Sequence, residues 1–114
     1  NLARAFIEQG KAPEAVEMLG KVLAIDPHYG RAHLQLGILL AQRGDMDGAV
    51  ERLGEAAREM PDSPEPHNFL AEIHMKRGQG EAALRELKAS LALRPDQPLV
   101  RQMMEKLAAG GPAP

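Results

Sequence analysis

Residues 30–63 read GRAHLQLGILLAQRGDMDGAVERLGEAAREMPDS, and this stretch predicts two amphipathic helices in succession. Apolar residues recur at helical spacing up to Gly44, a residue that suits the left-handed position at the end of a helix. Asp45 then stands where its side chain can accept hydrogen bonds from the unpaired amides of a second helix. We expect that helix to end at about Glu59, because Pro61 cannot continue it.

The pattern of this stretch recurs along the chain with a period of 34 residues. Four series keep the register: Pro27, Pro61 and Pro95; Gly10, Gly44 and Gly78; Ala15, Ala49 and Ala83; and Leu19, Leu53 and Leu87. The alanines have a packing reason, since a larger side chain would push apart two helices that cross closely. Gly37 and Ala71 offer the same close approach on the first helices of their hairpins. Because one hairpin cannot bury its apolar stripe alone, we expect neighbouring hairpins to stack.

The repeat divides the chain into five expected segments. These are a clipped repeat unit over residues 1–29, complete units over 30–63 and 64–97, a capping helix over 98–109 and a flexible tail over 110–114. The last helix carries Leu99, Val100, Met103, Met104 and Leu107, an apolar stripe that would cover the open end of the preceding hairpin. Because Asn1 enters a helical pattern directly and no methionine precedes it, we expect a piece of a longer polypeptide.

Composition excludes several classes of protein. The 114 residues include 14 Lys and Arg against 16 Asp and Glu, and this balance gives no reason to expect nucleic acid as a partner. No apolar run approaches the roughly 20 residues of a membrane span. Cysteine is absent, so disulfides and thiolate metal sites are excluded. The sequence does not identify the cellular compartment of the protein, and it slightly favours the cytoplasm over the periplasm.

No catalytic pattern emerges from the sequence, and we predict that the chain is not an enzyme and holds no cofactor. The glycines stand singly at helix ends and form no phosphate-binding loop. Ser63 and Ser90, the only serines, do not lie in a nucleophile-elbow context. Asp45 and Asp47 lie in a turn between helices, where helix capping explains them.

The repeat resembles that of the tetratricopeptide repeat family, whose 34-residue unit has Trp-x-x-Leu-Gly-x-x-Tyr, then Ala-x-x-x-Phe, then Pro. The matching residues are His33, Leu36, Gly37, Leu40, Ala49, Leu53 and Pro61 in the middle unit, His67, Leu70, Ala71, His74, Ala83, Leu87 and Pro95 in the third, and Leu2, Ala3, Phe6, Ala15, Leu19 and Pro27 in the first. The resemblance covers about residues 1–97. It implies an all-α solenoid, a right-handed superhelix of stacked antiparallel helical hairpins with a C-terminal capping helix. A composition rich in Ala, Gly, Arg and Leu suggests a bacterial source.

The resemblance also implies a partner-binding groove, because in this family the first helices of successive hairpins line a concave face that takes a peptide or helix of another protein. By register, that face carries Arg4, Ile7, Glu8, Arg31, Leu34, Gln35, Ile38, Gln42, Glu65, Asn68, Phe69, Glu72, Met75 and Lys76. Ile7, Leu34, Ile38 and Met75 are apolar where a plain surface helix would be polar, which is typical of a binding patch. The alternative is that they pack between helices as ordinary core residues.

One subgroup of the family clamps the C-terminal carboxylates of chaperones with Lys, Asn and Arg. The corresponding places here hold Arg4, Gln35, Glu65 and Phe69. Glu65 would repel a carboxylate and Phe69 cannot donate a hydrogen bond, so the resemblance does not extend to that ligand. We expect instead a protein segment with apolar anchors.

Three histidines invite comparison with a metal site. His67 and His74 lie two turns apart on one helix, roughly 10 Å, which is too far to share one ion. Helical metal sites favour a spacing of three or four residues. We therefore interpret His33, His67 and His74 as filling positions where the family has aromatic residues, and we predict no metal.

The leading hypothesis is a scaffold that binds a protein or peptide partner. A first alternative is self-assembly through the uncapped start of the array, around Leu2, Phe6 and Val16. A second is that the array recruits a substrate for an enzyme elsewhere in a longer chain.

Overall fold

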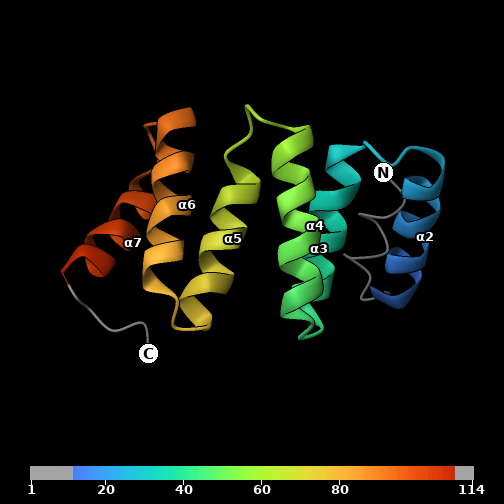
Figure 1. Cartoon of the computed structure of the whole chain (residues 1–114), viewed down its shortest axis with the longest axis horizontal. Helices are drawn as coiled ribbons and strands as arrows, with labels where there is room; N and C mark the ends of the chain where they lie inside the picture. The colour runs from blue at the N-terminus through green and yellow to red at the C-terminus, as the bar shows by residue number, and fades with distance from the viewer. Residues whose placement is uncertain (1–11, 110–114) are drawn as a thin grey trace. The chain divides into compact units, whose positions relative to one another are not determined.

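The computed structural model describes residues 12–109, and within them every regular element is an α-helix (Figure 1). The helices are α2 (Ala12–Ile25), α3 (Gly30–Gln42), α4 (Met46–Glu59), α5 (Glu65–Lys76), α6 (Gly80–Leu93) and α7 (Pro98–Ala108). The chain divides into two compact units, Asn1–Pro61 and Asp62–Pro114, which we call the first and second unit. No helix of the described part has both the length and the apolar character that crossing a membrane requires.

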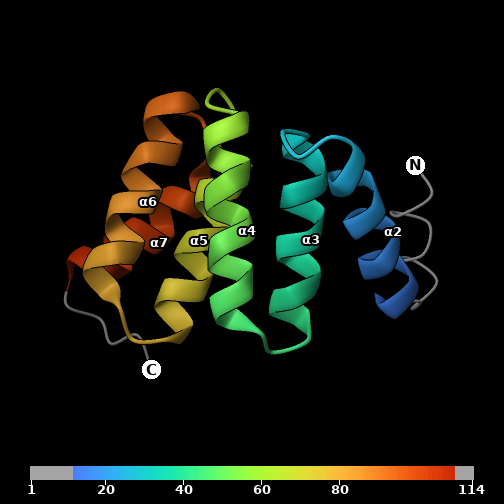
Figure 2. The ribbon, with the colours of Figure 1, turned by 45° about the vertical axis from the view of Figure 1, so that its right-hand side comes forward.

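In the first unit, α3 packs against both α2 and α4 (Figure 2). A core cluster of Ala15 and Leu19 from α2 with Ala32 and Leu39 from α3 joins the first two helices. Val16 is half-buried and packs against this cluster. Two of the residues offered as parts of a self-association edge, Leu2 and Phe6, lie outside the described residues.

The α3–α4 hairpin is held by a very close approach at Gly37. A Cβ atom added there would lie 2.7 Å from Cγ of Leu53 and 3.3 Å from the carbonyl oxygen of Ala49. Leu53 and Ala49 are both completely buried. At Gly37 the two helices therefore leave no room for a side chain, as the packing argument predicted.

The turns that follow α3 and α5 end these two helices in the same way. Gly44 adopts a φ of 86°, a left-handed conformation that costs glycine little. Its N–H donates to the Ala41 carbonyl, and the Asp45 N–H donates to the Leu40 carbonyl at 2.9 Å, which satisfies carbonyls that the helix leaves unpaired. The Asp45 carboxylate then accepts a hydrogen bond from the Gly48 N–H at 3.0 Å and caps α4. Gly78, with a φ of 71°, closes α5 by the same pair of bonds.

His33 is 4% exposed and acts as a polar link inside the first unit. Its Nε2 lies 2.8 Å from the Pro27 carbonyl oxygen, which can only accept, so Nε2 carries the proton. Nδ1 is then an acceptor for Arg52 Nη1 at 3.3 Å. His33 thus fills a buried position and ties the α2–α3 turn to α4.

His67 and His74 are half-buried, and each pairs with a single polar side chain. His67 Nδ1 lies 2.7 Å from Glu86 Oε1, which joins α5 to α6. His74 Nδ1 lies 2.8 Å from the side-chain oxygen of Gln79. Among residues 12–109, no group of three or more His, Asp or Glu side chains is placed to hold a metal ion.

In the second unit, α6 packs against both α5 and α7. The core cluster contains Ala71, Leu87 and Val100, one from each helix, with Leu91, Met103, Met104 and Leu107 packed against it. The last helix therefore covers the apolar side of the α5–α6 hairpin, as expected of a capping helix.

Candidate functional site

Two hollows lie on the second unit between α5 and α7. The first has a volume of about 410 Å³ and is lined by Glu72, Met75, Lys76 and Met103. The second has a volume of about 340 Å³ and is lined by Asn68, Glu72, Leu87, Gln97, Pro98, Leu99, Val100 and Met103. We call them the Met75 hollow and the Leu99 hollow. They adjoin, because Glu72 and Met103 line both.

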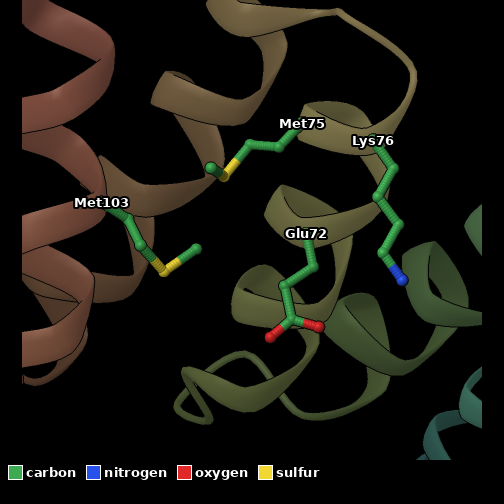
Figure 3. Close-up of a pocket in the computed structure, with 4 residues that line it drawn as sticks. All are labelled: Glu72, Met75, Lys76 and Met103. Carbon is green, nitrogen blue, oxygen red and sulfur yellow. The ribbon is translucent and has the colours of Figure 1, made fainter. Parts of the chain in front are cut away.

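The Met75 hollow has apolar walls contributed by two helices. Glu72, Met75 and Lys76 stand at positions i, i+3 and i+4 of α5, a spacing that places them on one face. Met103 reaches from α7 toward that face (Figure 3). Both methionines are half-buried, while Glu72 and Lys76 are exposed. Flexible thioether side chains fill irregular space and adapt to different apolar groups, so this hollow can accept an apolar side chain.

The Leu99 hollow has a buried floor and an exposed apolar rim. Leu87 is completely buried and Val100 is 7% exposed, so they form the part that belongs to the core. Leu99, the next residue along α7, is 73% exposed although it is apolar. An exposed leucine beside an apolar floor extends the surface on which a partner can bury apolar area.

Gln97 holds the start of α7 in place beside this hollow. Its Nε2 donates to the Arg94 carbonyl at 2.7 Å, to Ser90 Oγ at 3.0 Å and to the Ser90 carbonyl at 3.1 Å. Its Oε1 accepts from Asn68 Nδ2 of α5 at 3.0 Å. The one amide therefore ties the end of α6, the connecting turn and α5 together. Ser90 is completely buried, so these bonds satisfy polar groups that water does not reach.

Replacing Gln97 with alanine is expected to destabilise the second unit by about 1–3 kcal/mol, because Asn68 and Ser90 would lose their partners in a site with little water. The measurement is urea denaturation followed by circular dichroism. Gln102→Ala is the matched control, since Gln102 is an exposed residue of α7. Equal stabilities of the two variants would contradict the role assigned to Gln97.

The network also fixes the orientation of the Asn68 amide. The carbonyl oxygens of Ser90 and Arg94 can only accept, so Nε2 of Gln97 faces them and Oε1 faces α5. The donor Nδ2 of Asn68 must then face Gln97 Oε1. Asn68 Oδ1 is then left buried, with no hydrogen-bond partner among the described residues.

Four of the expected α5 residues thus line the hollows: Asn68, Glu72, Met75 and Lys76. Phe69 is half-buried and lines neither hollow. Glu65 is exposed and has an interaction partner within the structure.

The expected face of α3 is only partly accessible. Leu34 is 2% exposed, so the prediction that it offers an apolar anchor on the surface is wrong. The physical reason is that α3 packs against helices on two sides, so more of its circumference is covered than its main apolar stripe indicates. Gln35 and Ile38 are half-buried, and Arg31 and Gln42 are exposed. Arg4, Ile7 and Glu8 lie outside the described residues.

The sequence did not identify the contribution of α7, which supplies Pro98, Leu99, Val100 and Met103 to the hollows. That helix was interpreted as a cap alone. The available signal was Leu99, which stands directly beside Val100 and widens the apolar stripe beyond what covering a hairpin end requires.

Comparisons with known proteins agree with this architecture. A family model described as "Tetratricopeptide repeat" matches residues 6–56 and again residues 40–107. No curated protein sequence matches the chain. Similar solved structures include the type III secretion chaperone SycD of Yersinia enterocolitica in complex with a peptide of the translocator YopD, at 22% identity and a TM-score of 0.89, with 96% of this chain and 88% of SycD covered.

Two further structures were also solved with bound segments. One is the first TPR of Spaghetti (RPAP3) bound to the HSP90 peptide SRMEEVD, at 15% identity and a TM-score of 0.87, covering 95% of this chain and 86% of that one. The other is PcrH in complex with the chaperone binding region of PopD, at 21% identity and a TM-score of 0.78, covering 96% and 83%. At these identities the likeness shows the fold alone.

Proposed function

The chain belongs to the tetratricopeptide repeat family, and on this basis we propose that it is a protein-interaction module that holds a segment of a partner protein in the two hollows between α5 and α7. The observation that carries the proposal is the pair of adjoining hollows with apolar walls and a charged rim. Binding sites for small ligands and side chains have volumes of roughly 300–1,000 Å³, which includes both hollows.

The relatives support a bound segment rather than a small metabolite. SycD, PcrH and the first TPR of RPAP3 were each solved with a peptide or region of another protein. Here the walls consist mainly of Met75, Met103 and Leu99, so the partner must bring apolar side chains. We therefore propose an apolar-anchored segment, extended or helical, and not a carboxylate terminus.

A role in catalysis is not part of the proposal. The side chains that line the hollows are thioethers, aliphatic groups, amides and two opposite charges, and they include no hydroxyl or imidazole nucleophile. A substrate-recruiting role within a longer protein would use the same hollows. It is therefore compatible with this function and requires no further binding site on the described residues.

The function is tested by selecting ligands from a random dodecapeptide phage library against the full chain. We expect Leu99→Glu to lower the affinity for the selected peptide about tenfold, because the change removes exposed apolar area and places a charge where an apolar side chain of the peptide would be buried. The measurement is fluorescence anisotropy with the labelled peptide.

Leu93→Glu is the matched control for this experiment. Leu93 is 38% exposed at the end of α6 and lines neither hollow, so the same apolar-to-acidic change should leave the affinity unchanged. A library that yields no peptide whose binding depends on Leu99 contradicts the proposed function. Light scattering of the free chain shows in parallel whether a second copy competes as the occupant.

A further inference from the structure

Glu72 occupies a special place in the candidate site, because it lines both hollows. Met75 lines only the first hollow, Leu99 and Val100 line only the second, and Met103 lines both. Figure 3 shows Glu72 and Met103 approaching the same space from α5 and α7. A carboxylate therefore stands at the junction between two apolar sites.

Within residues 12–109, no neighbouring cation forms an ion pair with the carboxylate of Glu72. Ion pairs of the described residues include those of Glu17, Glu51, Glu55, Glu59 and Glu86, and Glu72 is in none of them. Lys76 stands one turn further along α5, and within residues 12–109 no ion pair joins it to Glu72. Both charges are exposed and available to a ligand.

A bound apolar segment would change the surroundings of this carboxylate. Two apolar side chains seated in the hollows would exclude water on both sides of Glu72, and burying an unpaired charge carries a free-energy cost. A cation supplied by the ligand removes that cost and gains an attraction that strengthens as water leaves. An apolar ligand that lacks a positive charge between its two apolar side chains therefore binds with lower affinity.

We propose that the partner segment carries two apolar side chains with a lysine or arginine between them, the cation facing Glu72 and the apolar groups entering the two hollows. This inference rests on the proposed function and specifies its ligand. Lys76 also lines the Met75 hollow, so an acidic residue of the segment, placed beyond the side chain that enters this hollow, would pair with Lys76. This second pair fixes the direction in which the segment binds. The occupant is a segment of another protein with this pattern.

The test uses an array of synthetic dodecapeptides and the full chain. Each peptide has two leucines separated by one to five residues, with lysine, glutamine or glutamate placed between them and alanine or serine elsewhere. At the preferred spacing, we expect the lysine peptide to bind about tenfold more tightly than the glutamate peptide, with glutamine between. Fluorescence anisotropy gives the affinities.

The Glu72→Lys variant is expected to invert this order, so that the glutamate peptide binds most tightly. Glu105→Lys is the matched control, since Glu105 is an exposed residue of α7 that lines neither hollow, and the order should there stay that of the unmodified chain. Circular dichroism confirms that both variants keep their helices.

The inference is overturned if the order is the same in the unmodified chain and in Glu72→Lys, or if no peptide binds at any spacing. Its failure can be told apart from failure of the proposed function. If the affinity of the library-selected peptides depends on Leu99 but not on Glu72, the proposed function is supported and the proposed cation between the two apolar side chains is rejected. If the affinity depends on neither residue, both the proposed function and the proposed ligand pattern are rejected.

Discussion

Replacing Gly37 with alanine is expected to destabilise the first unit by about 1–3 kcal/mol, because an added methyl group must displace Leu53 or the α4 backbone. The new Cβ would lie 2.7 Å from Leu53 Cγ, the branch point of a completely buried side chain, and 3.3 Å from the Ala49 carbonyl oxygen. Neither atom is the end of a flexible chain, so the two helices must move apart. The measurement is urea denaturation of the full chain.

The same substitution at Gly54 has the opposite expected sign. Gly54 lies inside α4, and a Cβ atom added there would meet nothing within 4 Å. Alanine favours a helix interior over glycine by about 1 kcal/mol, so Gly54→Ala should stabilise the first unit. Two variants that change stability in the same direction would contradict the close approach at Gly37.

The helix boundaries followed from the sequence because their causes are local. Gly44 alone indicated where α3 ends, and the predicted end of α4 at Glu59 is confirmed. The 34-residue period predicted the packing positions, since it showed which alanines and leucines occupy equivalent places in successive hairpins. The buried positions of Ala15, Ala49 and Ala83 confirm the packing argument.

The accessible surface was harder to predict, because it depends on how many neighbours a helix has. Register alone put Leu34 and Met75 on equivalent faces, yet Leu34 is buried whereas Met75 borders a hollow. The part played by α7 depends on where Met103 and Leu99 lie relative to α5. Helical periodicity carries no information on that placement, which arises from tertiary packing.

Changing both Met75 and Met103 to glutamate is expected to lower the affinity of the chain for the library-selected peptide about a hundredfold. Each substitution removes an apolar wall that contributes about 1.5 kcal/mol when covered, and each places a charge where an apolar side chain of the peptide would exclude water. The affinity is measured by fluorescence anisotropy. The conservative pair Met75→Leu and Met103→Leu keeps the apolar volume and should retain binding within a few-fold.

The observation that would contradict this expectation is unchanged affinity in the glutamate variant while circular dichroism shows an intact fold. Both side chains are half-buried rather than enclosed, so the acidic groups can reach water in the unbound chain. The helical content should therefore survive the substitutions, and the loss of affinity reports on the hollow itself.

The central claim, that the hollows between α5 and α7 bind the partner segment, is tested most directly by the ¹³C spectrum of the methionine ε-methyl groups. The chain has six methionines, among them Met75 and Met103 at the Met75 hollow and Met18 on α2 of the first unit. Titration with the selected peptide should shift the Met75 and Met103 signals and leave that of Met18 in place. Shifts confined to methionines outside the hollow, with Met75 and Met103 unchanged at saturation, would contradict the claim.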